Sequence, residues 1–186
     1  MAEYQENEHY FTSLLAVEDN FFDFFSFPLD SGNPLKNLAG HNGAVISKQL
    51  AGKIFGSENP VGKMIRIPFV SFGEKNEFVV EGVFPGFPNT SLPEADVIIS
   101  HESYKECASK IWGSRRDWTG DPRVEFIRTE KGGDIESIKT SLTTILNNIA
   151  GREEYYKIEL VSLKDYHCKY GHGSRAYGRF RNTDIY

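Results

Sequence analysis

The residues best suited to metal or nucleophilic chemistry lie in the stretch DYHCKYGH near the end of the sequence. Asp165, His167, Cys168 and His172 are all side-chain types that bind zinc or copper. Their spacing matches no standard metal site, and adjacent side chains on a strand point to opposite faces. The same residues could supply a Cys-His nucleophile, but spacing shows neither a base within reach nor an oxyanion hole. A hydrolase at this cluster is one hypothesis, and it requires these side chains to converge.

The segment GSENPVGK, from Gly56 to Lys63, has some features of a phosphate-binding loop. That loop has four residues between its glycines and a Ser or Thr after the lysine. Here five residues separate Gly56 from Gly62, and Met64 stands where the hydroxyl is needed. The segment also follows an expected helix and precedes an expected strand, the reverse of the order that aims helix amides at a phosphate. We interpret it as a Pro-Gly turn and expect no cofactor.

Carboxylates are scattered through the expected loops and strand ends, and any two of them could form an acid-base pair. Any acidic protein of this size offers such pairs, so we interpret these as solvated surface charge. The sequence thus gives no catalytic, cofactor-binding or metal-binding residue to assign. The carboxylates concerned are Asp96, Asp117, Asp121, Glu125 and Asp134.

The charge balance argues against nucleic acid as a partner. The 186 residues carry a formal net charge of -5, whereas phosphate binding needs clustered Lys and Arg. The one basic cluster, Arg175, Arg179 and Arg181, is interpreted as a surface segment. No apolar run approaches the roughly 20 residues of a membrane-spanning helix, so the chain as written is expected to be soluble. A fragment cut from between two membrane helices would look the same.

Two cysteines, Cys107 and Cys168, fit no zinc or redox motif, because such motifs need paired C-x-x-C elements. They could form a disulfide in an oxidising compartment or remain two separate thiols. The distance between their Cα atoms would decide, and the sequence leaves both possibilities open.

The elements that would position these residues follow from hydrophobic periodicity and breaker residues. Residues 10–17 predict a strand, and residues 28–43, rich in Gly, Pro and Asn, predict a loop. A short strand at 44–46 leads to Ser47 as the N-cap of a helix that ends at Gly56. The apolar face of this helix consists of Leu50, Ala51, Ile54 and Phe55.

The segments GKMIRIPF and EFVVEGVF bracket a turn-like stretch and predict a β-hairpin. Ile65, Ile67 and Phe69 share one face of its first strand. The second strand is apolar on both faces except at Glu81, so it should be the more central of the two. The breaker-rich residues 85–94 follow and mark the expected internal boundary.

The second half alternates strands with helices, so the predicted fold class is α+β. A helix from Asp134 to Ala150 is strongly indicated, because its apolar residues recur at helical spacing between Gly133 and Gly151. The other elements predicted there are strands at 95–100, 123–130 and 155–163 and a helix at 101–112 that Ser100 caps.

Three stretches together resemble a known family: AVEDNFFDFFSFPLDSGNP, GAVISKQLAGKIFGSENPVGKMIRI and FVVEGVFPGFPNTSLPEADVIIS. Their order and spacing are similar to the MacB-like periplasmic core domain of FtsX-like ABC transporter permeases, especially the long permeases of Bacteroidetes. The turn FGSENPVGK is the most specific element, and the closing LVSLKDYH resembles the segment that leads back to the membrane.

This resemblance implies an extracytoplasmic domain, excised between transmembrane helices, at the periplasmic face of the inner membrane. It implies a discontinuous porter-like α/β subdomain of β-α-β repeats, residues 1–42 and 93–186, with a small β-rich subdomain inserted at 43–92. It also implies a non-enzymatic module that couples ATP hydrolysis on a separate domain to substrate export or extraction. The implied partners are the transmembrane part of the same permease, a cytoplasmic ABC ATPase and, as a further option, a periplasmic adaptor or lipoprotein.

The alternative is a free-standing periplasmic domain that binds a small ligand or a peptide in an exposed aromatic cleft. The stretch NFFDFFSFPLDSG bears on this choice, because five of its residues from Phe21 to Phe27 are phenylalanines. We expect a short helix whose Phe21, Phe24 and Phe25 pack on the sheet, while Phe22 or Phe27 contacts the inserted subdomain. Two or more exposed rings would instead favour partner binding.

Overall fold

The computed structural model describes residues 2–11, 13–33, 38, 42–68, 75–87, 95–112, 125–151, 156–163 and 165. The chain divides into two compact units, Met1–Asp117 and Trp118–Tyr186. Each unit is described by itself below.

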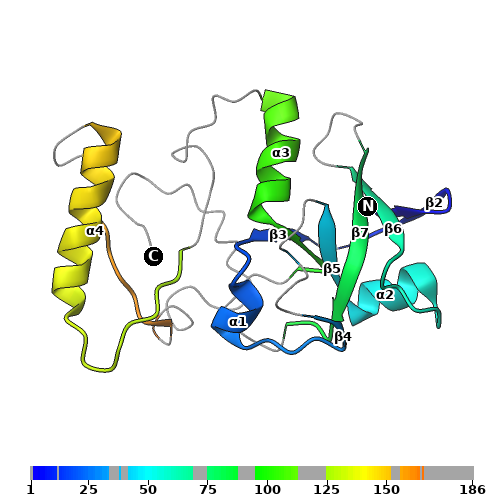
Figure 1. Cartoon of the computed structure of the whole chain (residues 1–186), viewed down its shortest axis with the longest axis horizontal. Helices are drawn as coiled ribbons and strands as arrows, with labels where there is room; N and C mark the ends of the chain where they lie inside the picture. Colours follow the sequence, from blue (N-terminus) through cyan, green and yellow to red (C-terminus); the bar gives the residue numbers. More distant parts are fainter. Residues whose placement is uncertain are drawn as a thin grey trace. The chain divides into compact units, whose positions relative to one another are not determined.

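Unit 1 is built on an eight-stranded mixed sheet, in which β5 and β7 lie side by side at the centre (Figure 1). The strand order is β2-β1-β6-β7-β5-β8-β3, and β4 also pairs with β7. The strands are β1 (Ala2–Tyr4), β2 (Asn7–His9), β3 (Leu14–Val17), β4 (Ser31–Gly32), β5 (Gly43–Ser47), β6 (Met64–Pro68), β7 (Lys75–Phe84) and β8 (Val97–Ser100).

The pairing pattern confirms the predicted α+β class and the β-hairpin. β6 and β7 pair antiparallel, and β7 is the more central strand because β5 pairs with its other edge. β5 is parallel to β7 and antiparallel to β8, and β8 is parallel to β3. The sheet therefore joins strands of residues 43–92 to strands on either side of them. The division into a porter-like and an inserted subdomain stays a prediction.

The strand predicted over residues 10–17 is shorter in the structure, because β3 begins only at Leu14. Its partner β8 sets this limit, since Leu14 is paired with Val97, the first residue of β8. Before this point, the Ser13 carbonyl accepts a hydrogen bond of 3.0 Å from the Asp96 amide.

The strand-helix unit predicted around Ser47 is confirmed. β5 leads directly into α2 (Lys48–Phe55), and the Ser47 side chain accepts a hydrogen bond of 3.1 Å from the Leu50 amide. This bond satisfies one of the amides that a helix start leaves without a partner. The helix ends at Gly56, whose φ of 61° favours glycine. As predicted, α2 turns one apolar face into the core: Leu50, Ala51, Ile54 and Phe55.

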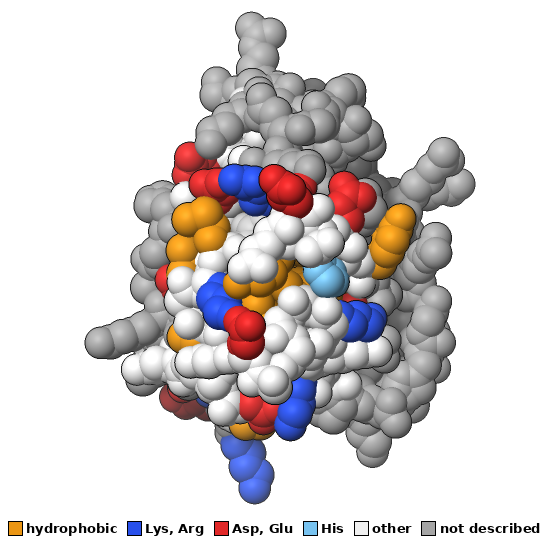
Figure 2. All heavy atoms as spheres, turned by 90° about the vertical axis from the view of Figure 1, so that its right-hand side faces the viewer, with side chains coloured by type: hydrophobic (Ala, Val, Ile, Leu, Met, Phe, Trp, Pro, Cys, Tyr) orange, Lys and Arg blue, Asp and Glu red, His pale blue; other side chains and the backbone are white. Residues whose placement is uncertain are grey.

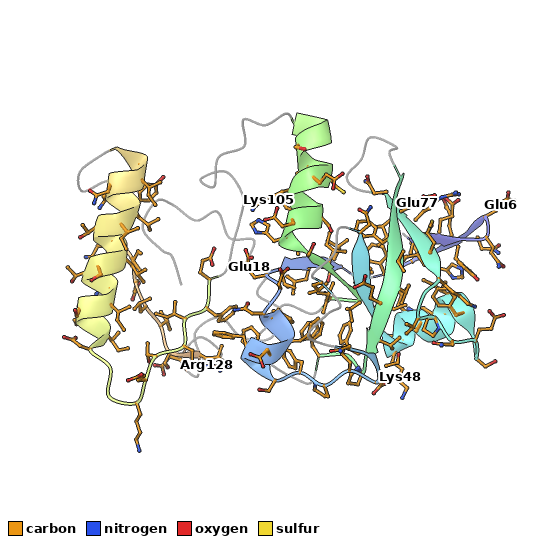
Figure 3. The ribbon with its side chains drawn as sticks, in the orientation of Figure 1. Glu6, Glu18, Lys48, Glu77, Lys105 and Arg128 are labelled. Atoms are coloured by element: carbon orange, nitrogen blue, oxygen red, sulfur yellow. The ribbon has the colours of Figure 1, made fainter. Side chains whose placement is uncertain are left out.

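The helix that follows β8 is also confirmed. α3 (His101–Trp112) begins beside Ser100, whose hydroxyl accepts a hydrogen bond of 3.1 Å from the Ser103 amide. Glu18 lies near the base of α3 (Figure 3), where its carboxylate is 2.8 Å from Nδ1 of His101. This contact links the residue after β3 to the first residue of α3.

Unit 2 contains α4 (Ile135–Ala150), which confirms the predicted helix except that Asp134 is its N-cap and not its first residue. Asp134 accepts a hydrogen bond of 3.1 Å from the Ser137 amide at the start of the helix. Gly151 ends it with a φ of 62°, a conformation that glycine adopts without strain.

Two strands predicted around α4 are wrong over their described parts. Residues 125–130 and 156–162 carry no regular secondary structure. Over residues 156–162, side chains of α4 make hydrogen bonds to the backbone that a neighbouring strand would otherwise make. The Asn147 side chain accepts from the Tyr156 amide at 2.7 Å and donates to its carbonyl at 3.0 Å. The Ile158 amide donates to the Thr143 hydroxyl at 3.3 Å.

Candidate functional site

An apolar pocket of about 310 Å³ lies beside the phenylalanine-rich segment of unit 1. Its walls come from α1 (Phe21–Phe25), from the residues after α1, from the end of β7 and from β8. Side chains crowd the space between α1 and the end of β7 (Figure 3). The lining residues are Phe22, Phe27, Pro28, Phe84, Pro85, Gly86, Phe87 and Ile98.

Burial separates a floor from a rim in this pocket. Phe22, Phe84 and Ile98 form the floor and are 2%, 3% and 0% exposed. Among the rim residues, Pro28 and Pro85 are exposed, whereas Phe27, Gly86 and Phe87 are half-buried. The pocket therefore opens toward solvent at the rim and ends against the core of the sheet.

Backbone hydrogen bonds fix the wall that α1 provides. The Phe27 amide donates to the Phe22 carbonyl at 3.0 Å, and Ser26 takes the left-handed conformation with a φ of 55°. Further along, the Asp30 amide donates to the Val83 carbonyl at 2.7 Å. The chain between α1 and β4 is thus attached to the helix at one end and to β7 at the other.

Ring contacts close the cluster across the two walls. Phe27 and Phe87 meet edge to face, with ring centroids 5.4 Å apart. Phe87 also contacts Phe84 at 5.3 Å and Phe21 at 6.4 Å. Edge-to-face pairs at these distances add stabilisation beyond the burial of area.

The predicted short helix is confirmed, and Phe21 is buried as expected. The assignment of faces needs correction, because Phe22 is more buried than Phe24 or Phe25, which are only half-buried. The Phe22 side chain lines the pocket with Phe84 and Ile98, whereas Phe24 and Phe25 do not line it. The expected contact of Phe27 with residues 43–92 is present, through Phe87. None of the five rings is exposed, so the exposed-cluster interpretation lacks support.

Glu81 lies on β7, where the pairing with β5 shifts register by one residue. Ala44 is paired with Val80 and Val45 with Gly82, so Glu81 is the extra residue of a β-bulge. Its Oε2 atom is shielded from solvent and has no hydrogen-bond partner within the described part of the chain. Burial raises the pKa of the Glu81 carboxyl above its ordinary value.

The phosphate-loop-like segment forms a turn between α2 and β6, in the predicted order. The Gly62 amide donates to the Val80 carbonyl at 2.8 Å, so this amide is committed to the sheet. Lys63 forms an ion pair with Glu58, and its ammonium lies 5.2 Å from the centroid of the Phe55 ring. Hydrogen bonding to Glu58 raises the pKa of Lys63. The lysine side chain thus packs against the surface of unit 1.

The interpretation of all five carboxylates as solvated charge is wrong for one of them. Asp96 is buried and accepts a hydrogen bond of 2.7 Å from the Ser47 hydroxyl, because the end of β5 and the start of β8 meet there. Asp134 caps α4. Glu125 is exposed, as predicted. Asp117 and Asp121 lie outside the described residues.

The candidate cluster at DYHCKYGH is described only at Asp165, which accepts a hydrogen bond of 2.7 Å from the Ser162 hydroxyl. Cys107 is buried in the core of unit 1. Among the residues with described positions, no group of three or more His, Cys, Asp or Glu side chains could hold a metal ion. The residues that fall outside the described part are His167, Cys168, His172, Arg175, Arg179 and Arg181.

The visible surface carries both signs of charge. Figure 2 shows acidic and basic side chains intermingled with hydrophobic ones on the face turned to the viewer. Arg66 illustrates the mixing, since its guanidinium lies 3.0 Å from Glu77 and 3.6 Å from Glu3 on neighbouring strands. In the described ranges, no helix has both the length and the apolar character needed to cross a membrane.

Known proteins were compared with this chain at the level of sequence and of structure. No curated protein sequence matches it significantly. A domain described as part of a permease from Porphyromonas gingivalis is 22% identical, with a TM-score of 0.56. The match covers 83% of this chain and 61% of that one. The extracellular domain of the ABC-type transporter YknZ from Gram-positive bacteria is 20% identical, with a TM-score of 0.52 over 82% and 72% of the two chains.

The periplasmic region of MacB from Actinobacillus actinomycetemcomitans is 19% identical, with a TM-score of 0.48 over 74% of this chain and 56% of that one. The chain thus spans less than two thirds of the MacB region and of the Porphyromonas domain. A family model described as the MacB-like periplasmic core domain matches residues 2–145. Since this match covers most of the sequence, the chain belongs to the MacB-like periplasmic core domain family.

Proposed function

We propose that this chain transmits ATP-driven conformational change within an ABC transporter permease and so supports export or extraction of a substrate. The observation that carries the proposal is the family match over residues 2–145. The family consists of periplasmic permease domains and is not itself catalytic, so the proposed function is mechanical. ATP hydrolysis then takes place on a separate nucleotide-binding domain.

The architecture of unit 1 supports such a function. Its strands form one hydrogen-bonded sheet, and β5 connects the two sides of that sheet through ladders with β7 and β8. Every residue of β5 and β8 is buried, including Val45, Ile46 and Ile98. A close-packed interior is only slightly compressible, so a displacement at one edge moves the whole sheet.

The proposed partners follow from this assignment. The transmembrane part of the same permease would hold the domain at the periplasmic face of the inner membrane. A cytoplasmic ABC ATPase would supply the driving energy, and a periplasmic adaptor or lipoprotein would be a further partner. The exposed surface with charges of both signs suits such protein contacts better than it suits nucleic acid.

The test uses the complete permease with its ATPase in proteoliposomes. A donor fluorophore is attached at Lys53→Cys, an exposed position on α2, and an acceptor is placed in the adjacent lipid leaflet. We expect energy transfer to change on addition of ATP and not of ADP. The protein without the Lys53→Cys substitution controls for labelling of the native cysteines. Export that proceeds without any ATP-dependent change in energy transfer would contradict the proposal.

A free-standing binding domain is the second candidate, and the aromatic pocket is the observation that favours it. The two candidates make opposite predictions for the gene. A permease domain requires encoded transmembrane helices in the same reading frame and an ATPase gene to act with it. A reading frame without any transmembrane helix would reject the permease assignment and leave the binding domain.

A further inference from the structure

We propose that the aromatic pocket is a binding site for an uncharged, apolar small molecule or molecular group about the size of two fused aromatic rings. This inference does not depend on the proposed mechanical function. The four observations that carry it are the chemistry of the lining, the volume, the fixed walls and the charge of the surrounding segment.

The lining offers almost nothing to a polar ligand. Among the lining residues whose positions the structure describes, no side chain carries a charge, a hydroxyl or an amide. The rim also lacks backbone donors at Pro28 and Pro85, because proline has no N–H. The Phe27 amide is already used in its bond to the Phe22 carbonyl. A ligand group that enters this pocket therefore gains free energy by leaving water and not by hydrogen bonding.

The volume limits the size of that group. An apolar cavity of about 150 Å³ lined by similar side chains stays dry and holds one benzene molecule. A pocket of about 310 Å³ is therefore large enough for about two fused rings. Because the rim is open to solvent, a longer ligand can leave its remaining part outside.

The walls are formed before any ligand binds. Hydrogen bonds from Phe27 to Phe22 and from Asp30 to Val83 hold the wall that follows α1. The Phe27 and Phe87 rings contact each other at one side of the pocket. Since few side chains need to be ordered on binding, little of the gain from burial is lost to conformational entropy.

The charge of the wall segment argues that the ligand is uncharged. Between Asn20 and Gly32 the charged residues are Asp23 and Asp30, both acidic, and the segment contains no basic residue. An anionic ligand would meet like charge there. Asp30 also forms an ion pair with Lys48 at 3.4 Å, so its charge is balanced without a cationic ligand. An uncharged ligand therefore suits this pocket better than an anionic or a cationic one.

The experiment titrates the whole chain with prodan, a neutral naphthalene fluorophore whose emission shifts to the blue in apolar surroundings. We expect saturable binding that 2-methylnaphthalene displaces and that 2-naphthalenesulfonate, an anion with the same rings, does not displace. Calorimetry of the same titration should give a negative heat-capacity change, which marks burial of apolar surface.

Matched variants localise the site. Phe27→Ala and Phe87→Ala each remove a rim ring, and we expect prodan affinity to fall about tenfold. Phe25→Ala is the control, because Phe25 contacts Phe27 at 5.7 Å but does not line the pocket. Its affinity should stay within about twofold of the wild type. Circular dichroism and thermal unfolding show whether each variant is folded. If a variant is unfolded, Phe27→Trp, which narrows the rim, is measured in its place.

Several results would overturn the proposal. One is the absence of saturable prodan binding. Another is a loss of affinity in Phe25→Ala as large as that in Phe27→Ala and Phe87→Ala. A third is displacement of prodan by the sulfonate as strong as that by methylnaphthalene. Displacement by N-acetyltryptophanamide but not by methylnaphthalene would assign the pocket to a peptide side chain and reject the small-molecule site.

Discussion

Phe22 occupies a different position from the other phenylalanines of its segment. It is 2% exposed and forms part of the pocket floor together with Phe84 and Ile98. Phe25 is half-buried and makes ring contacts with Phe21, Phe24 and Phe27. The composition of the segment alone does not reveal this difference, because five identical side chains occupy seven positions.

Truncation of these two residues should have unequal costs. We expect Phe22→Ala to lower the free energy of unfolding by about 3 to 5 kcal/mol, since it removes a buried ring and leaves a cavity. Phe25→Ala should cost about 1 to 2 kcal/mol, because the half-exposed ring loses less burial. Urea denaturation of both variants measures the difference. Equal costs would show that Phe22 is no more important to the core than its neighbour.

Glu81 should make stability depend on pH in an unusual direction for a carboxylate. Burial raises its pKa in the folded state, so the folded protein binds this proton more tightly than the unfolded chain. The stability linked to this proton is fully present below the unfolded pKa of 4.5 and is lost as pH rises through the raised pKa. Glu81→Gln should therefore be more stable than the wild type at pH 7, with a smaller gain at pH 4.

Glu77→Gln provides the matched control, because Glu77 lies on the same strand but is exposed and paired with Arg66. Its substitution should show no such gain at pH 7. Urea midpoints at the two pH values measure both variants. A gain for Glu81→Gln that is the same at pH 4 and pH 7 would contradict a burial-driven shift of the pKa.

The hairpin of β1 and β2 was not predicted from the sequence, and neither was β4, which lies within the loop predicted over residues 28–43. The two-residue turn of the hairpin, Gln5 and Glu6, has positive φ angles of 49° and 66°. Such turns strongly prefer Asn-Gly or Asp-Gly, because most other residues are strained there. The hairpin nevertheless packs on the sheet, since Ala2 is buried and Glu3 is paired with Arg66 of β6.

Relief of this strain should stabilise the protein. The double substitution Gln5→Asn with Glu6→Gly should raise the free energy of unfolding by about 1 kcal/mol, because asparagine and glycine both tolerate positive φ angles. Thermal and urea unfolding measure the change. The reversed sequence, Gln5→Gly with Glu6→Asn, controls for the loss of the Glu6 charge. A decrease in stability would show that the turn tolerates its native residues without strain.

Elements with a complete local signal were predicted well from the sequence. Ser47 and Gly56 mark both ends of α2, and Asp134 and Gly151 mark both ends of α4. The failures depend on contacts that the sequence does not show. Residues 156–162 have strand-like composition, yet the backbone amides of Tyr156 and Ile158 donate hydrogen bonds to side chains of α4.

The pocket also could not be predicted from the sequence. The phenylalanines and the Pro-Gly stretch after β7 are evident in the sequence, but their juxtaposition depends on pairing between β4 and β7, about 50 residues apart. Such non-local pairing leaves no local pattern. The burial of Asp96 is a second case, because its partner Ser47 lies 49 positions away.

For the whole molecule, the two compact units lead to a prediction about truncation. A chain that ends at Asp117 contains all strands of the sheet together with α2 and α3, so it should unfold in one cooperative urea transition. Residues 118–186 alone should not, because Ile158 is the only side chain buried within the described part of unit 2. Circular dichroism of both pieces measures the outcome.

The opposite result would have a specific meaning. If the chain ending at Asp117 were unfolded, the sheet would depend on the second half, as the discontinuous porter-like subdomain predicts. A cooperative transition would instead make residues 1–117 the folding unit.

The position of β5 between β7 and β8 also decides how the sheet resists pulling. Ladder hydrogen bonds run across the strands, so a load applied along β5 acts on the bonds of both ladders in shear. Bonds in shear must break together, whereas a load applied across the strands opens them one after another. The sheet is therefore mechanically strong along its strands and weak across them. A pulling measurement with attachment points at the start of β5 and at the end of the parallel strand β7 should thus give a higher rupture force than one with attachment points on β2 and β3, the outermost strands.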